Sequence, residues 1–323
     1  MKKGVLLATI GIVAFAAGSV GYMSAVKENG VLSPTCSGKY SLIDSRFNCD
    51  EYSDSFSVLK ALQSTLESNI NHFKLNSDVS RASVWVRDLS TLQWVGVNEK
   101  DLYAPASLFK VPIMIAIYKY AEIQPDILDQ KIAYTAAAAG NVADVLPETT
   151  RMKEGAEYSV EQVVEQMIKY SDNEAFAMLT QRLSTPFLTE VYGDLGIHLA
   201  QNQSGLDDLV TARSYANIFR ILYQSSYLTP EYSQRALSIL SETEYQQGVR
   251  TAVPKDVRVA HKFGIRKETN DQGVVLDIKL HDCGIVYVPS RPYLYCILTE
   301  GSDESRLSSV IASLSHDIYT AFQ

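Results

Sequence analysis

A serine and a lysine stand three residues apart at the entrance of an apolar segment, in the stretch YAPASLFKVPIMIAIYKYAE. Residues 108–121 are apolar on nearly every side, which predicts a buried helix. Side chains at positions i and i+3 share one helix face, so Ser107 and Lys110 should be neighbours. In the first turn of a helix the backbone N–H groups lack helical partners and can face developing negative charge. This placement suits a nucleophile.

A serine hydroxyl is a poor nucleophile unless a nearby base accepts its proton. Lys110 can be that base only in its neutral form, and both burial and a neighbouring positive charge lower the pKa of a lysine. The tetrapeptide by itself is weak evidence, because Ser-x-x-Lys occurs often by chance. A serine at a helix start beside a lysine that extends to solvent is the simpler interpretation of Ser107 and Lys110 alone.

A second polar cluster, Ser171-Asp172-Asn173, lies at the break between two helical patterns at 160–170 and 174–183. All three residue types favour caps and turns, so a capping turn is one interpretation. The functional alternative makes Ser171 a proton relay and Asn173 an amide donor to a substrate.

A third cluster, His261-Lys262-Phe263-Gly264, lies in a β-rich segment at 257–265. Lysine on an edge strand commonly prevents aggregation, which is the structural interpretation. Glycine there also permits the close approach of a ligand backbone. Lys262 can then lower the pKa of Lys110 or attract a substrate carboxylate.

The elements that must position these residues fall into an ordered pattern along the chain. Strand patterns lie at both ends of the region after residue 57, and helical patterns fill its middle. We therefore predict one antiparallel sheet made from both ends and covered by the first and last helices, with a separate helical lobe and a cleft between them. The expected helices are 57–73, 108–121, 160–170, 174–183, 214–224, one capped by Thr229, and 306–322; the expected strands are 80–89, 92–100, 257–265, 274–288 and 293–301.

Taken together, SLFK, SDN and KFG resemble the signature S-x-x-K, S-D-N and K-T-G of the penicillin-recognising serine hydrolases, and of class A β-lactamases most closely. The resemblance covers roughly residues 57–323 and implies an α+β fold: an antiparallel five-stranded sheet flanked by helices, plus an all-helical lobe. It implies no cofactor and no metal. Its catalytic residues would be Ser107, Lys110, Ser171 and Lys262, and its substrate-binding residues Asn173, Phe263, Gly264 and Ile265.

The resemblance also assigns a role to each of these residues. Ser107 would be acylated with Lys110 as its base, and Ser171 would pass a proton to the leaving nitrogen. Asn173 would bind the substrate amide, and Lys262 would supply electrostatic stabilisation. The N–H groups of Ser107 and Ile265 would form the oxyanion hole.

The sequence departs from the family pattern in two places. Phe263 replaces a hydroxyl residue that in the family helps to hold the β-lactam carboxylate, and it could narrow the cleft. Class A enzymes also carry a Glu-x-x-Leu-Asn loop that positions the deacylating water, but the segment 196–216 lacks it and is shortened. The nearest carboxylates, Asp207 and Asp208, are shorter than Glu and stand in the wrong register.

We therefore predict a serine hydrolase that forms an acyl-enzyme on Ser107 with β-lactams or related amides and deacylates slowly. A D,D-peptidase or esterase acting on cell-wall peptides is the first alternative. A non-catalytic sensor that binds β-lactams or wall fragments is the second, but binding alone needs no lysine-activated nucleophile.

The N-terminus predicts export. Met1-Lys2-Lys3 precedes an uncharged apolar stretch at 4–26, and about 20 apolar residues span a bilayer. The lysines favour a cytoplasmic N-terminus. Residues 1–26 are thus a signal anchor, or alternatively a cleaved signal peptide. Residues 27–56 would be an extracytoplasmic spacer, and 57–323 a hydrolase domain tethered outside the cytoplasmic membrane, or secreted after cleavage.

Composition narrows the possible partners. The 323 residues are 46% hydrophobic, enough for one large domain or two small ones. A net charge of −8 without a Lys/Arg run argues against nucleic acid. The spacings of the 4 cysteines and 5 histidines match no zinc site. Outside the cytoplasm Cys36 and Cys49 should form a disulfide, whereas Cys283 and Cys296 are left open as a pair or as small core residues.

Overall fold

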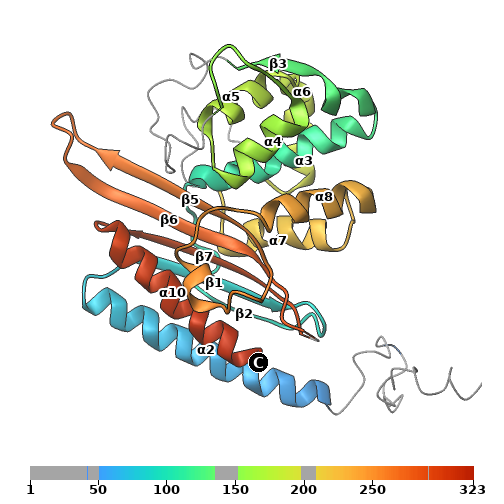
Figure 1. Ribbon diagram of the computed structural model, residues 1–323. Helices are drawn as coiled ribbons and strands as arrows, with labels where there is room; N and C mark the ends of the chain where they lie inside the picture. The colour runs from blue at the N-terminus through green and yellow to red at the C-terminus, as the bar shows by residue number, and fades with distance from the viewer. Residues whose placement is uncertain (1–41, 43–50, 135–151, 198–208, 290) are drawn as a thin grey trace, which may run out of the picture. The chain divides into compact units, whose positions relative to one another are not determined.

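The computed structural model describes residues 42, 51–134, 152–197, 209–289 and 291–323 (Figure 1). It separates into two units, 1–55 and 56–323, and the second contains the elements discussed below, apart from the first turn of the first helix. The apolar N-terminal stretch, the pair Cys36 and Cys49, and the carboxylates Asp207 and Asp208 lie outside the described residues. No helix in the described ranges combines the length and the apolar character needed to span a bilayer.

One antiparallel sheet joins the two ends of the domain, as predicted. Its strand order is β2-β1-β7-β6-β5, so β5 is an edge strand, and the register places Trp85 of β1 opposite Cys296 of β7. Its alternating β-branched and aromatic residues bury both faces, which explains why these segments pair as strands. The strands are β1 (Arg81–Asp88), β2 (Trp94–Val97), β5 (Val259–Thr269), β6 (Val275–Val286) and β7 (Tyr293–Gly301).

Two helices cover one face of this sheet, α2 (Glu51–Leu75) and α10 (Glu304–Ala321) (Figure 1). Asn69 of α2 donates a hydrogen bond to Asp317 of α10 at 2.7 Å. Helix α2 begins at Glu51, so the last residues of the segment predicted as a spacer belong to this helix. Apolar side chains at helical spacing bury this layer, among them Leu59, Leu62, Leu66, Ile70, Leu307, Ile311, Leu314 and Ile318.

The other face carries a lobe built around α3 (Lys110–Ala121), which is buried on nearly every side. Five further helices of the lobe are α4 (Val160–Lys169), α5 (Asn173–Gln181), α6 (Thr185–Asp194), α7 (Ala212–Tyr223) and α8 (Pro230–Leu240). The lobe is not all helical, contrary to the sequence prediction, because β3 (Lys131–Ala133) and β4 (Glu157–Ser159) pair within it. Strands of three residues are too short to show an alternating pattern. The remaining elements are the 3₁₀ turns η2 (Ala106–Phe109) and η3 (Pro125–Asp129) and the short helix α9 (Val249–Ala252).

The open question about the two late cysteines is resolved by a disulfide between Cys283 and Cys296. The two residues lie directly opposite each other on β6 and β7. Both belong to the core shared with the helical lobe, in the same cross-strand row as Lys262 and Trp85. The disulfide therefore joins the central strands directly beneath the lobe.

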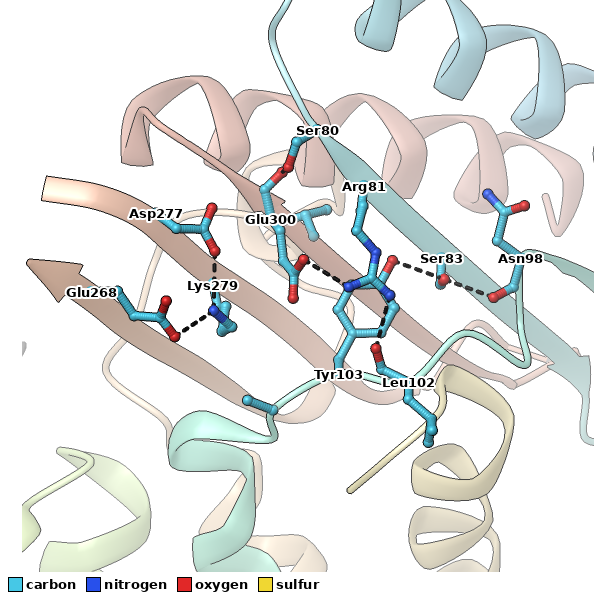
Figure 2. Close-up of polar contacts among 12 residues, drawn as sticks. Ser80, Arg81, Ser83, Asn98, Leu102, Tyr103, Glu268, Asp277, Lys279 and Glu300 are labelled. Atoms are coloured by element: carbon cyan, nitrogen blue, oxygen red, sulfur yellow. Dashed lines mark hydrogen bonds and ion pairs between the residues drawn. The ribbon is translucent and has the colours of Figure 1, made fainter. Parts of the chain in front are cut away.

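A polar network fixes the segment between β2 and η2 on the sheet (Figure 2). Arg81 forms an ion pair with Glu300 at 3.0 Å and donates to the carbonyl of Leu102 at 2.9 Å. The hydroxyl of Ser83 donates to the carbonyl of Asn98 at 2.7 Å and lies 3.0 Å from the Tyr103 hydroxyl. Burial raises the pKa of Tyr103 to about 12, so the phenol stays neutral. The path of the chain toward Ser107 is thus set by the sheet.

His281 holds the next residue of this path. Its Nε2 donates to the Ala104 carbonyl at 2.9 Å, and its Nδ1 accepts from the Thr299 N–H at 3.2 Å. Together these bonds require a neutral imidazole with its proton on Nε2. Burial lowers the pKa of His281 to about 4, which agrees with that assignment.

We predict that His281 makes the fold acid-sensitive. Between pH 6.5 and about 4 the unfolded chain binds a proton at this residue and the folded chain does not. The free energy of unfolding should therefore fall with decreasing pH, by up to roughly 3 kcal/mol from this group. His281→Gln should flatten that part of the pH dependence of urea unfolding, and the exposed control His316→Gln should not. An NMR titration that gave His281 an ordinary pKa near 6.5 would contradict the assignment.

Candidate active site

Ser107 and Lys110 are neighbours, as their spacing predicts. The Lys110 ammonium donates to the Ser107 hydroxyl at 3.1 Å. Ser107 lies in the 3₁₀ turn η2, and Lys110, which is 2% exposed, is the first residue of α3. The residue before the serine, Ala106, has φ of +49°, in the left-handed region that an alanine seldom adopts. The chain therefore turns sharply just before it presents Ser107.

The second motif meets the first at the same ammonium group. Lys110 Nζ donates to the Ser171 carbonyl at 2.5 Å, to the Ser171 hydroxyl at 3.2 Å and to Asn173 Oδ1 at 2.7 Å. Ser171 has φ of +58°, and this backbone conformation accompanies a carbonyl and a hydroxyl that both contact Lys110. All these acceptors are uncharged oxygens. They orient the ammonium without stabilising its charge as a carboxylate would.

The capping interpretation of this motif is also correct, and the residue that caps the helix is the middle one. Asp172 is the N-cap of α5, with Oδ1 accepting from the Ala175 N–H at 2.9 Å. Gln166 of α4 donates to its other carboxylate oxygen at 3.2 Å. Asp172 thereby fixes the turn, while Ser171 and Asn173 on either side of it face Lys110.

Lys262 adds a second buried lysine to the site. It is fully buried, its Nζ donates to the Phe263 carbonyl at 3.1 Å, and it lies 4.0 Å from the centre of the Phe263 ring. Burial, followed by the charge of Lys110, holds the pKa of Lys262 well below its ordinary value, and Asp282 opposes this shift. The two lysines therefore interact electrostatically. The hydrogen bond of Lys262 goes to its neighbouring carbonyl rather than to a serine of the site.

The side chain of Phe263 does not line the cleft. It is fully buried in the core shared with α2 and α10, and it stacks on Tyr245 with ring centroids 4.0 Å apart and an interplanar angle of 14°. The expectation that this ring narrows the cleft or binds substrate is therefore wrong. Successive strand residues point to opposite faces, so the aromatic side chain joined the helix-covered face of the sheet.

Gly264 allows β5 to lie against the turn that carries the serine. A Cβ atom at this position would be 3.1 Å from Leu108 N and 3.1 Å from the Pro105 carbonyl oxygen, both backbone atoms. From the other side, the Tyr215 hydroxyl of α7 donates to the Leu108 carbonyl at 2.7 Å. The turn η2 is therefore fixed between α7 and the edge strand, and the strand segment Gly264-Ile265 lies beside it.

One buried carboxylate that acts on Lys262 was not singled out by the sequence analysis, Asp282 of β6. Asp282 Oδ1 lies 2.9 Å from His261 Nδ1 and accepts from the Tyr295 hydroxyl at 2.8 Å. Asp282 and His261 are each 1% exposed. The available signal was Asp282 in the middle of a predicted strand, because a buried carboxylate needs partners. The segment expected to hold the deacylating residue is described only at Gly196, Ile197 and from Leu209 onward.

Comparison with known proteins agrees with this architecture. The sequence model of the β-lactamase enzyme family matches residues 65–322, so the chain belongs to that family. A search of curated proteins returned no match.

Solved structures share the fold. An acyl-enzyme complex of a PBP-A mutant with penicillin G is 22% identical, with a TM-score of 0.68 over 82% of this chain and 97% of that one. The TLA-1 extended-spectrum β-lactamase is 17% identical, with a TM-score of 0.68 over 80% and 98%. An ancestral class A β-lactamase is 22% identical, with a TM-score of 0.66 over 80% and 100%. The predicted family and the five-stranded α+β fold are confirmed.

We predict that Gly264→Ala damages the site with little effect on folding elsewhere. The new methyl group must push β5 away from the backbone of η2, and a displacement of about 1 Å in an active site can reduce a rate by 10²-fold. Acylation of Ser107 by a penicillin should slow at least about 10-fold, measured by quenched-flow mass spectrometry. Gly193→Ala is the matched control, because its Cβ would meet nothing within 4 Å and its helical backbone is unstrained. Equal acylation rates in both variants would disprove the role of this contact.

Proposed function

We propose that this protein is a serine acyl-enzyme that opens β-lactams or related amides by forming an ester on Ser107. The observation that carries the proposal is the arrangement of Ser107 Oγ and Ser171 Oγ around Lys110 Nζ, at 3.1 and 3.2 Å. Such distances lie within the range for direct proton transfer between a nucleophile, its base and a relay. Family membership adds independent support.

In the first step, neutral Lys110 accepts the proton of Ser107 as Oγ attacks the amide carbon. The N–H groups of Ser107 and Ile265 stabilise the negative charge that develops on the carbonyl oxygen. Ser171 then donates its proton to the leaving nitrogen and is reprotonated by Lys110, as the C–N bond breaks. A positive charge on Lys262 would favour both the neutral state of Lys110 and the anionic transition state.

The substrate class follows from the likeness to relatives and from two side chains. The related PBP-A structure is an acyl-enzyme complex with penicillin G, which supports a β-lactam here. Asn173, the first residue of α5, supplies a side-chain amide that can bind the substrate. Phe263 has no hydroxyl and is packed in the core. A substrate carboxylate must therefore be held by residues at other positions.

We predict that Ser107 is the acylated residue and that Lys110 acts as a neutral base. Intact mass after incubation with penicillin should increase by one penicillin, and peptide mapping should locate the adduct on Ser107. Ser107→Ala should abolish it. Acylation should fall at low pH, where lysine is protonated, and Lys110→Arg should be nearly inactive because a guanidinium does not deprotonate. Normal acylation by the Arg variant would reduce Lys110 to a structural cation.

The second half-reaction is expected to be slow. Hydrolysis of the ester needs a base that activates water, and such a base contributes roughly 10²–10⁴-fold. The segment 196–216 contains no glutamate, and Lys110 already serves the first half-reaction. The same feature favours a second candidate function, a D,D-peptidase or esterase for cell-wall peptides, in which Lys110 and Ser171 serve both steps with another acceptor.

We predict an initial burst followed by slow turnover. Stopped-flow absorbance with a chromogenic cephalosporin should show about one equivalent of rapid cleavage, and time-resolved mass spectrometry should show a persistent adduct. Rapid linear turnover without an accumulated adduct would contradict this and make Asp207 and Asp208 the first residues to replace. If the protein turns over a D-alanyl ester faster than the cephalosporin, the peptidase function is favoured. Complete lack of an adduct with either compound would instead favour a non-catalytic sensor.

The proposed cellular setting completes this function. Residues 4–26 would anchor the chain in the cytoplasmic membrane, or be removed on export, and place the hydrolase domain where cell-wall peptides and β-lactams occur. Detection of the intact N-terminus in membrane fractions would distinguish the anchor from a cleaved signal.

A further inference from the structure

A cleft separate from the serine site opens where β1 and β2 meet the start of α7. Its volume is about 580 Å³, and none of the residues lining it belongs to the three motifs. Six of its lining side chains carry the chemistry: Trp85, Arg87, Trp94, Arg213, Asn217 and Arg220. A cleft of this size accommodates a small molecule.

Three guanidinium groups share this cleft. Arg87 donates to the Leu92 carbonyl at 3.1 Å, and Arg220 donates to the Asn217 amide oxygen at 2.7 Å. Within the described ranges no carboxylate forms an ion pair with Arg87, Arg213 or Arg220. Burial, followed by the charges of Arg220 and Arg213, lowers the pKa of Arg87. The three cations therefore repel one another, and an anion between them would relieve that repulsion.

Two indole rings form the apolar part of the cleft. Trp85 and Trp94 stack with centroids 6.2 Å apart and an interplanar angle of 25°. The guanidinium of Arg213 lies 4.7 Å from the Trp94 ring, and that of Arg87 lies 5.6 Å from the Trp85 ring. Trp94 is 40% exposed, a large fraction for a tryptophan that already packs against another ring. An exposed indole beside cations can stack on a flat ring of a ligand.

We propose that this cleft is a second ligand site, which binds a small molecule that carries two or more phosphate or carboxylate charges joined to a flat ring. Arginine is suited to this task because its planar group binds phosphate or carboxylate oxygens in pairs. The three guanidinium groups hold the anionic part, and Trp94 stacks on the ring. This site operates independently of acylation at Ser107.

The composition of the chain provides a direct measurement. The protein has 2 tryptophans, and both line the cleft, so intrinsic tryptophan fluorescence reports on this site alone. Uridine diphosphate is the probe that has both a ring and several charges; pyrophosphate has only the charges, and uridine only the ring. We expect saturable quenching, tightest with uridine diphosphate, weaker with pyrophosphate and weakest with uridine. Affinity for both anions should weaken as salt rises from 50 to 200 mM.

Variants separate this site from general effects. Arg213→Gln and Arg220→Gln should each weaken uridine diphosphate binding about 10-fold or more, since hydrogen bonds to charged groups contribute most to such contacts. Trp94→Ala should remove the preference for uridine diphosphate over pyrophosphate, measured by calorimetry. Arg258→Gln is the matched control, an exposed arginine outside the cleft. Penicillin acylation should be unchanged in all four, so loss of binding and loss of the serine chemistry are distinguishable.

Two results would overturn the proposal. One is a lack of saturable quenching or binding heat with uridine diphosphate and with pyrophosphate at low salt. The other is binding by the folded Arg213→Gln/Arg220→Gln double variant with the affinity of the parent protein, which would place the anion elsewhere.

Discussion

The hydrogen bonds of the buried Lys110 amine are the interactions on which the rest of the site depends. They join the serine three residues before the lysine to a turn 61 residues later in the chain. A buried polar group is costly unless hydrogen bonds satisfy it, so its partners must be held rigidly. This requirement explains why α3 is apolar on nearly every side. The helix forms the core of the lobe and fixes the lysine at its first position, and the helices packed around it fix the acceptors.

The second lysine of the site, Lys262, shows that this arrangement lowers the stability of the fold. The pKa of Lys262 is lowered by burial and by Lys110, so below the ordinary pKa of lysine the unfolded chain binds a proton more readily than the folded one. The free energy of unfolding therefore decreases as pH falls toward the folded-state pKa. Asp282, held by Tyr295 and His261, offsets part of this cost. A side chain that does not titrate would avoid this cost, so a lysine is kept here at the expense of stability.

The elements that are long enough to show a periodic pattern could be predicted from the sequence. So could the pairing of residues that lie close together along the chain. The five sheet strands, the main helices and the Ser107–Lys110 pair all appear in the structure. The short strands β3 and β4 carry too few residues for a pattern, and the orientation of Phe263 depends on which face of β5 meets the helices. The arginine cleft could not be predicted either, since Arg87 and Arg220 are far apart in sequence and meet only through packing of α7 on the sheet.

The structural and functional interpretations of each motif turn out to be compatible. Asp172 caps α5, and by doing so it places Ser171 and Asn173 against Lys110. Gly264 has no side chain, so β5 packs directly on η2. This close packing places the strand next to Ser107. Ala106 and Ser171, at φ of +49° and +58°, are both strained, and such residues cost about 1–3 kcal/mol each. Packing on both sides of η2 and the cap of α5 sustain that strain, so the ordinary stabilising contacts of the fold are also what hold the serine and its base in place.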